Sequence, residues 1–175
     1  MEHVLVVTNK NDEKILRKKT EEYDIALLKD GKEREKLRDV VRKMREAMRR
    51  CDGVGLSANQ IGLPHRLFVA QIPDNQGKMK SYAVLNPNLE KMSDEKETIE
   101  EGCLSVPRRY GPVPRHHQVT LTGYNPNGKK LKIKAWGLLA RVFQHEIDHL
   151  DGKLFIDRAT TVYETETEEG GGQKI

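Results

Sequence analysis

The sequence predicts an α+β domain in which antiparallel β-sheets pack around a central helix that carries the pattern HExxH, with a second amphipathic helix near the N-terminus. Apolar residues recur at helical spacing in two segments, and short strand-like segments lie on either side of turn-forming residues. Strands joined by tight turns rather than by helices form antiparallel sheets. The 175 residues suffice for one compact domain with a core and are too few for two ordinary ones.

The first helix is expected between Glu33 and Arg50, where apolar residues recur every three or four positions and charged residues lie between them. Its apolar face consists of Leu37, Val40, Val41, Met44, Ala47 and Met48. Gly53 and Gly55 follow directly, and glycines at this place end a helix and open a loop.

The strands are expected after this loop, in short runs that alternate in polarity or are rich in β-branched and aromatic residues. They span residues 67–72, 82–85, 119–124 and 130–136. The segments 73–77 and 125–128 combine proline, asparagine and glycine, so they form turns between neighbouring strands. The period then becomes helical over residues 138–150, and Gly152 lies just beyond the end of this helix.

The predicted catalytic domain covers residues 1–163 as a single unit. Residues 164–175 contain four glutamates and three consecutive glycines, a composition that buries too little surface to offset the entropy of ordering it. We therefore expect residues 164–175 to form an acidic, disordered tail.

Composition excludes a disordered chain and a membrane-embedded one. Hydrophobic residues make up 36% of the sequence, and 14 glycines bring the apolar share close to that of globular domains. No run approaches the roughly 18 to 20 apolar residues that cross a bilayer, and the amino end lacks a secretory pattern. The two cysteines are too few for a disulfide framework, which favours a reducing compartment. We expect a cytoplasmic protein, in the bacterial cytosol rather than in an organelle.

The charges favour a solvated surface. Lysine and arginine number 31 against 27 aspartates and glutamates, a net charge of +4, and the two signs alternate along most of the chain. Because no basic stripe contains aromatic residues, DNA is not an expected partner. Contact of the basic body with RNA or with a ribosome surface stays open as an alternative.

The residues that indicate a chemistry lie in the second predicted helix, where His145, Glu146 and His149 form the pattern HExxH. Residues four positions apart lie above one another on one face of a helix, so the two imidazoles can bind one metal ion. Glu146 is rotated by about 100° from His145 and can reach a water molecule at the metal without acting as a ligand. The spacing predicts a catalytic metal site, and two unrelated helical histidines are the alternative.

A catalytic metal usually has three protein ligands and one open position. No histidine follows His149, and the acidic residues beyond it lie just past the helix end or near the tail. Cys103, in the segment EGCLS at 101–105, is therefore the better candidate for the third ligand. A cysteine taken alone is more often an inert buried residue.

Three segments together resemble the peptide deformylase family. Residues 53–60 (GVGLSANQ) resemble its glycine-rich motif, residues 101–105 its cysteine motif, and residues 144–150 (QHEIDHL) its metal-binding helix. They match the family in order and spacing, and the likeness covers most of the chain. The family commonly has alanine, proline and smaller or fewer basic residues where this chain has Ser57, Asn59, Arg108 and Arg109.

The resemblance implies a metal-dependent hydrolase that removes the formyl group from the N-terminal formylmethionine of newly synthesised polypeptides and releases formate. The ligands of its one divalent metal ion are implied to be Cys103, His145 and His149. Glu146 is implied to act as general base and then as general acid. The side-chain amide of Gln60 and the backbone N–H of Leu104 are implied to stabilise the charge that grows on the formyl oxygen.

The resemblance also implies how a peptide binds. The backbone of Gly55 pairs with the substrate as an added strand, which binds a peptide with little regard to most side chains. The methionine pocket and the adjoining groove are implied to be formed by Val54, Ile99, Glu101, Gly102, Leu138 and Val142. Core packing is the alternative for the apolar members. Arg115 is expected to pair with Glu101 or Asp148.

Thiolate and imidazole ligands suit zinc, iron, nickel or cobalt, and the resemblance favours Fe²⁺. The expected partners are N-formylmethionyl nascent polypeptides, with neither DNA nor a membrane. We expect a monomer. Transient ribosome contact stays open, although the sequence indicates no carboxy-terminal helix for such docking.

Two other functions stay open at this stage. A metallopeptidase would apply the same HExxH chemistry to internal peptide bonds, and it predicts a third ligand downstream of the helix and a groove open on both sides of the metal. A non-catalytic protein with a structural metal, or one that only binds peptide termini, predicts a fourth protein ligand or the loss of the base.

Overall fold

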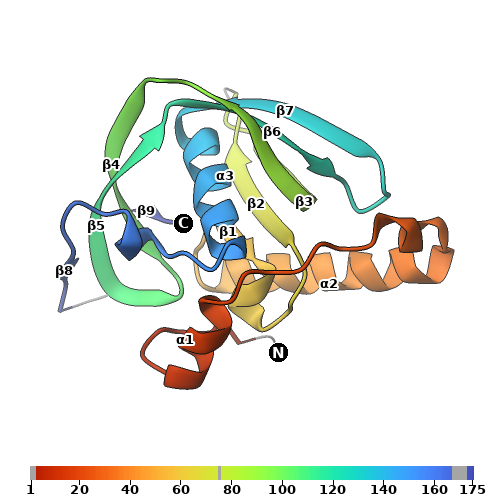
Figure 1. Ribbon diagram of the computed structural model, residues 1–175, viewed down its shortest axis with the longest axis horizontal. Helices are drawn as coiled ribbons and strands as arrows, with labels where there is room; N and C mark the ends of the chain where they lie inside the picture. Colours follow the sequence, from red (N-terminus) through yellow and green to blue (C-terminus); the bar gives the residue numbers. More distant parts are fainter. Residues whose placement is uncertain (1–2, 75, 167–172) are drawn as a thin grey trace.

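The computed structural model describes residues 3–74, 76–166 and 173–175, and it confirms the α+β fold class (Figure 1). The α-helices are α1 (Lys10–Leu16), α2 (Gly31–Arg50) and α3 (Gly137–Leu150). The strands are β1 (Gly55–Ser57), β2 (Leu67–Pro73), β3 (Met79–Met92), β4 (Lys96–Cys103), β5 (Val106–His116), β6 (Gln118–Tyr124), β7 (Lys130–Trp136), β8 (Tyr163–Glu164) and β9 (Gln173–Lys174).

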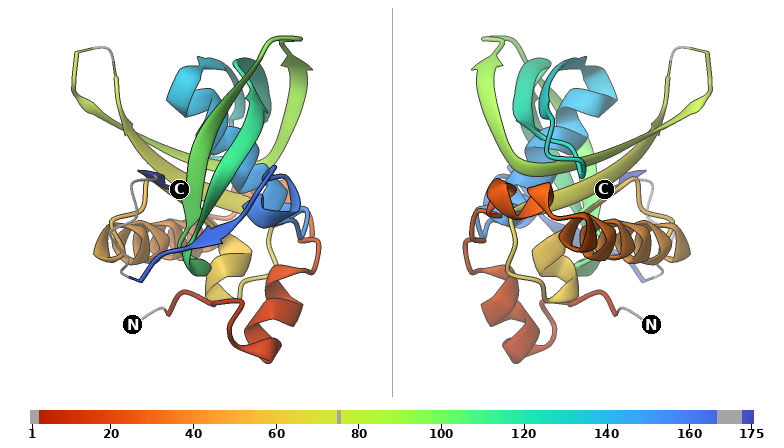
Figure 2. Two further views of the ribbon diagram at one scale, coloured as in Figure 1. Left: turned by 90° about the vertical axis from the view of Figure 1, so that its left-hand side faces the viewer. Right: turned by 90° about the vertical axis from the view of Figure 1, so that its right-hand side faces the viewer.

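The strands form two sheets with α3 between them. One sheet has the order β1-β2-β3-β6-β7 and is antiparallel throughout, and the other has the order β8-β5-β4-β9. Figures 1 and 2 show α3 crossing the space between the β4–β5 hairpin and the larger sheet. Every residue of α3 from Ala140 to Leu150 is buried, so both its apolar and its polar side chains face protein.

Both predicted helices are confirmed. The amphipathic segment forms α2, where the carboxylate of Asp30 accepts a hydrogen bond from the backbone N–H of Lys32 and so caps the helix. The HExxH segment forms α3, and Gly152 follows its end with a φ of 72°. A side chain at Gly152 would also meet the backbone of Arg17, so only glycine fits this turn.

All four predicted strands are present as β2, β3, β6 and β7, and β3 is much longer than expected. The β4–β5 hairpin was not predicted, although its buried charged residues pair with residues of α3. Its buried positions include the charged residues Glu101 and Arg115, which break the alternation of apolar and polar residues that normally identifies a strand. The helix α1 was also not predicted, because only Leu16 within it is buried.

The segment 164–175, predicted as a disordered tail, departs from this prediction at both ends. Glu164 belongs to β8, which pairs with β5, and Gln173–Lys174 form β9, which pairs with β4. The boundary expected at residue 163 falls within β8. Strand pairing uses backbone groups that every residue except proline carries in full, so a short polar segment can also pair with a free sheet edge. Residues 167–172 lie outside the described residues.

Among the described residues, two of the three apolar clusters pack helices against the larger sheet. One lies between α2 and strands β1 and β2 and includes Met44, Met48 and Leu56. The other lies between α3 and the larger sheet and includes Phe68 and Phe143, whose ring centroids are 5.6 Å apart. The second cluster fixes the height and rotation of α3, and with them the placement of its histidines.

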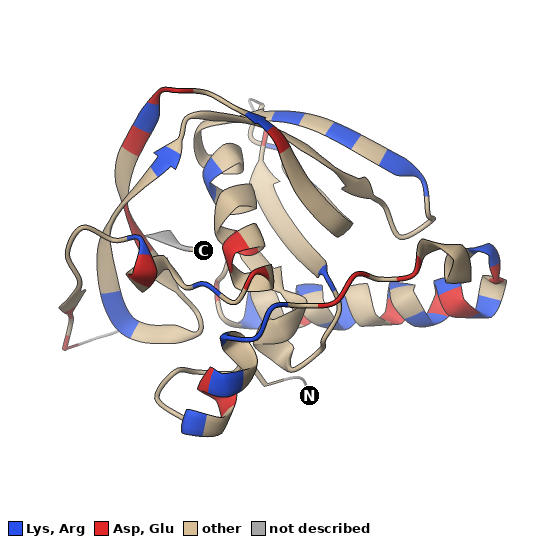
Figure 3. Ribbon diagram, in the orientation of Figure 1, with Lys and Arg blue, Asp and Glu red and all other residues tan. Residues whose placement is uncertain are grey.

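Charged side chains are spread over the outside of this frame. Figure 3 shows lysines and arginines interspersed with acidic residues along α2, and lysines spaced along β7. Among the residues that the structure describes, no helix combines the length and apolar character needed to span a membrane.

Candidate metal centre

The two histidines of the HExxH pattern lie on one face of α3, as their spacing predicts. The Nε2 atoms of His145 and His149 are 3.2 Å apart, and both rings are buried. At this distance the two nitrogens can share one proton in a hydrogen bond or direct their lone pairs at one metal ion. The helix therefore presents half of a cation site.

Cys103 completes the cluster from the end of β4. Its Sγ lies 3.1 Å from His149 Nε2, and the three donor atoms lie within 4.8 Å of one another. Donors of a tetrahedral ion with bonds of 2.0 to 2.3 Å are separated by about 3.3 to 3.6 Å, so the spacing fits one ion with little adjustment. The strand register shifts between Gly102 and Cys103, and such an irregularity turns a side chain away from the regular alternation.

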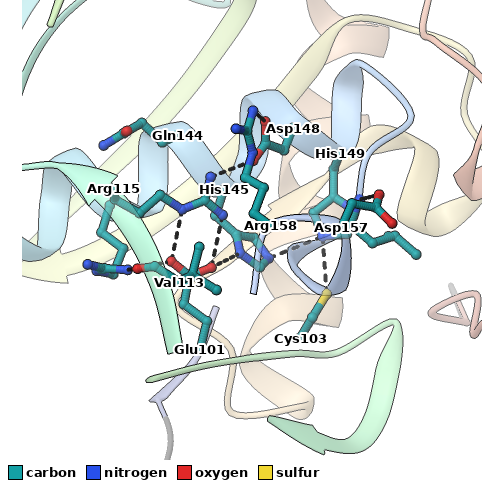
Figure 4. A network of polar contacts seen from close by, with 12 residues as sticks. Glu101, Cys103, Val113, Arg115, Gln144, His145, Asp148, His149, Asp157 and Arg158 are labelled. Carbon is teal, nitrogen blue, oxygen red and sulfur yellow. Dashed lines mark hydrogen bonds and ion pairs between the residues drawn. The ribbon is translucent and has the colours of Figure 1, made fainter. Parts of the chain in front are cut away.

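Glu101 sets the orientation of His145 (Figure 4). The Nδ1 of His145 lies 3.0 Å from Glu101 Oε2, so Nδ1 carries the proton and Nε2 offers its lone pair to a metal ion. Burial favours the neutral acid, but hydrogen bonds from Arg115 and His145 outweigh it and hold the pKa of Glu101 far below its usual range. Glu101 is therefore a buried carboxylate anion.

The expectation that Arg115 pairs with Glu101 or Asp148 is confirmed for both partners. Arg115 donates to both oxygens of Glu101 at 2.9 Å and also contacts Asp148. Arg141 donates to Glu101 at 2.7 Å, and Arg158 donates to Asp148 at 2.6 and 2.7 Å. These pairs join β4 and β5 to α3 behind the metal ligands, so the hairpin and the helix keep a fixed relation.

The electric field of the cluster favours a positive charge. Burial lowers the pKa of His145, but hydrogen bonding and attraction from Cys103 and Glu101 outweigh it and raise that pKa to about 10. Burial and the charge of His145 lower the pKa of His149 instead. One positive charge is thus stabilised at this point, and a metal ion bound in place of the proton would supply it.

Glu146 lies beside the ligands without joining them. Its carboxylate is fully buried, its Oε2 accepts a hydrogen bond from Ser57 Oγ at 2.6 Å, and its Oε1 has no hydrogen-bond partner among the described residues. Burial raises the pKa of Glu146 to about 7. A carboxyl group with a pKa near neutrality can both take up and release a proton, as a general base and acid must.

Gln60 is oriented toward the ligand cluster. Its Oε1 accepts a hydrogen bond from the backbone N–H of Ser57 at 2.8 Å, which fixes the direction of the amide. Its Nε2 points the other way, 3.1 Å from Ser105 Oγ and 3.8 Å from Cys103 Sγ. Leu104 follows Cys103 directly and packs against the cluster beneath α2.

The residues expected to bind the peptide fall into two groups. Val142 of α3 belongs to the apolar cluster between α3 and the larger sheet, and Val54 and Leu138 pack against that cluster. Gly55 lies in the edge strand β1, and Gly102 lies in β4. Ile99 is 42% exposed and does not belong to this apolar cluster.

Two site residues, Ser57 and Arg141, were missed by the sequence reasoning. Arg141 lies four residues before His145, and the helical spacing that pairs the histidines could have placed it on the same face. Ser57 gave no comparable signal, because its partner lies 89 residues further along the chain. Only the packing of β1 against α3 brings them together.

The fold and the site define a class of protein: an α+β domain in which one cysteine and two histidines are grouped closely enough to hold one metal ion. Residues 4–164 match the family model described as polypeptide deformylase. The chain is 40% identical over 156 residues to the peptide deformylase of Natranaerobius thermophilus. The aligned region covers 89% of this chain and 93% of the relative. It is 48% identical over 118 residues to the peptide deformylase of Desulforudis audaxviator. This aligned region covers 67% of this chain and 74% of the relative.

Solved structures agree with these relatives. The peptide deformylase of Thermotoga maritima superposes with a TM-score of 0.78 and 34% identity, covering 92% of this chain and 99% of that one. A probable peptide deformylase from Synechococcus phage S-SSM7 gives a TM-score of 0.79 and 35% identity, over 90% and 99%. The chain belongs to the peptide deformylase family. It is a metal-dependent hydrolase that removes the N-terminal formyl group from nascent polypeptides.

Proposed function

We propose that this chain performs deformylation with Cys103, His145 and His149 as the three protein ligands of one divalent metal ion. The observation that carries the proposal is the convergence of one sulfur and two Nε2 atoms from β4 and α3, next to the buried carboxylate of Glu146. The ion supplies Lewis acidity, which polarises a carbonyl oxygen and makes water acidic enough to react near neutral pH.

Glu146 moves the proton in this proposal. Its unpartnered Oε1 takes a proton from the attacking water and delivers it to the amine that leaves as formate is released. Ser57 holds Oε2, so the carboxylate keeps one oxygen free for this transfer. General acid and base catalysis of this kind typically contributes about 10²- to 10⁴-fold to the rate.

Gln60 and Leu104 stabilise the oxygen of the formyl group. The NH₂ group of Gln60 lies 3.8 Å from Cys103 Sγ, and Leu104 follows Cys103 directly, so both proposed donors belong to residues next to this proposed ligand. Loss of one such donor typically lowers kcat by about 10²- to 10³-fold.

The peptide lies between the two sheets in this proposal. Strand β1 is at the edge of the larger sheet, so the backbone of Gly55 is placed to pair with an extended peptide. Val54, Leu138 and Val142 receive the methionine side chain. Glu101 and Gly102 form the opposite wall in β4, and Ile99 lies at the exposed rim.

The ligand set suits Fe²⁺, Zn²⁺, Ni²⁺ or Co²⁺, and the family resemblance favours Fe²⁺. We also infer that the enzyme acts as a monomer in the cytoplasm on N-formylmethionyl nascent polypeptides. Lysines spaced along β7 are compatible with transient ribosome contact.

The two alternative functions lack support from the site. A peptidase of the usual HExxH type takes its third ligand from downstream of the helix, whereas the third donor here is Cys103, which precedes it. A closed structural site needs a fourth ligand, and the described residues provide three donor atoms in one cluster.

The test is formate release from a formylmethionyl peptide by the protein loaded anaerobically with Fe²⁺ or Ni²⁺. Glu146→Gln should lower kcat at least about 10²-fold while metal content stays equal to that of the wild type, because only the base is lost. Cys103→Ala should lose both metal and activity. Cys51→Ala, at a free thiol outside the donor cluster, serves as the matched control and should change neither.

Cleavage of internal peptide bonds by the loaded wild type, with formyl groups left intact, would contradict the proposal. Full activity in Glu146→Gln would contradict only the proposed role of Glu146 as the base.

A further inference from the structure

The outer edge of β4 is covered by the chain's own segment Gln173–Ile175. The short strand β9 runs parallel to β4, with Gln173 opposite Glu101 and Lys174 opposite Gly102. The backbone N–H of Ile175 then donates to the carbonyl oxygen of Gly102 at 3.1 Å. Glu101 and Gly102 are the residues of β4 that we assign to peptide binding, so this segment uses backbone groups that a substrate would need.

The side chain of Ile175 is buried in the apolar cluster from which the expected methionine pocket is formed. It is only 1% exposed and belongs to the same apolar cluster as Val142. Val54 and Leu138 pack against this cluster. Isoleucine and methionine are both apolar and of similar volume, so one pocket can take either side chain.

We propose that the segment Gln173–Ile175 occupies the peptide groove of its own chain and competes there with formylmethionyl peptides. The proposal rests on the proposed function, because that function assigns Gly102, Val54, Leu138 and Val142 to peptide binding. The interaction surface consists of the edge of β4 and the apolar pocket beside α3. Its partner is an extended segment that contains a buried aliphatic side chain.

The physical basis is strand addition combined with a high local concentration. Three residues that add to a strand edge make few contacts and bind weakly as a free peptide. A segment of the same chain is present at an effective concentration in the millimolar range, which compensates for weak contacts. A weak intramolecular contact is reversible, so a substrate with more contacts can displace it.

Occupancy by the segment raises the apparent KM and leaves kcat unchanged, because a displaced segment no longer affects the bound substrate. If at least half of the molecules are occupied, the apparent affinity for peptide falls by at least about twofold. Removal of the contact should therefore raise the apparent affinity for peptide by the same factor.

The experiment compares KM and kcat for a short formylmethionyl peptide in three variants of the metal-loaded protein. The first ends at residue 172, the second is Ile175→Asp, and the third is the control Ile15→Asp, which makes the same replacement at an isoleucine 42% exposed in α1. The shortened chain and Ile175→Asp should lower KM at least about twofold with kcat unchanged. Ile15→Asp should match the wild type.

A second measurement does not depend on activity. In protein labelled at isoleucine methyl groups, the Ile175 signal should have the shift of a buried methyl, and an added methionyl peptide should move it to the random-coil position. Unchanged KM in both tail variants, or a random-coil shift for Ile175 without peptide, would overturn the proposal. If no variant releases formate, the proposed function fails, and the methyl signal still decides whether the segment occupies the groove.

Discussion

The carboxylate of Glu146 is held by two residues of β1. Ser57 Oγ lies 2.6 Å from Oε2 and 2.9 Å from the backbone oxygen of Glu146. Gly55 lies against the other oxygen, since a Cβ built on it would be 2.1 Å from Oε1. Ser57 has one hydroxyl proton for two acceptors, so it retains a hydrogen bond whether the carboxylate is ionised or protonated.

Ser57→Ala should therefore lower kcat about 10- to 100-fold with little change in KM, since a hydrogen bond to a charged group contributes about 1.5 to 3 kcal/mol. Metal content should stay equal to the wild type, because Ser57 does not contact the ligands. Steady-state kinetics with metal analysis checks both points. Ser81→Ala, at an exposed serine of β3, is the control. An unchanged kcat in Ser57→Ala would show that Glu146 is positioned without this hydroxyl.

At this scale the sequence predicted the chemistry better than the geometry. The spacing of His145 and His149 follows from helix pitch alone, and Cys103 was favoured because no later histidine was present. The approach of Ser57 and Gly55 to Glu146 could not be predicted from local patterns. It depends on how two elements that are distant in the sequence pack together.

The β4–β5 hairpin and α3 are joined by buried ion pairs rather than by apolar contacts alone. Arg115 bonds Glu101 of β4 and Asp148 of α3, and all three side chains are buried. This arrangement explains why the hairpin escaped prediction: its inward positions carry charges, so its sequence resembles a solvent-exposed segment. The predicted pairing of Arg115 was the one clue that linked these elements.

Arg115→Met should lower the free energy of unfolding by about 3 kcal/mol, because it leaves Glu101 and Asp148 buried with fewer partners. The loss is limited by Arg141 and Arg158, which still pair with these carboxylates. Urea denaturation of both proteins measures the difference. Arg109→Met on the same strand, where the guanidinium is exposed, should change stability by less than about 1 kcal/mol. Equal losses in the two variants would contradict the structural role of the buried network.

The three proposed metal ligands come from different layers of the molecule. Cys103 belongs to the smaller sheet, whereas His145 and His149 belong to the helix that packs on the larger sheet. A bound ion would join these layers. The fold class and four strands were predictable because their patterns are local, whereas the strand pairings made by residues 163–164 and 173–174 depend on backbone edges that composition does not reveal.

Binding of the metal should therefore raise the melting temperature of the whole domain. Free metal at about 1,000 times its Kd stabilises a folded protein by about 4 kcal/mol, which corresponds to roughly 8 to 16 °C for a domain of this size. Calorimetry of metal-free and Zn²⁺-loaded protein measures the shift. Cys103→Ala should show little gain on addition of Zn²⁺, and a gain equal to that of the wild type would indicate that the ion binds elsewhere.

The most direct test of the central claim is X-ray absorption spectroscopy at the zinc edge of the Zn²⁺-loaded protein. The structure predicts one sulfur ligand at about 2.3 Å and two imidazole nitrogens at about 2.0 to 2.1 Å, with the remaining position filled by a light atom from solvent. A spectrum without a sulfur ligand, or with a further protein ligand in place of solvent, would contradict the account.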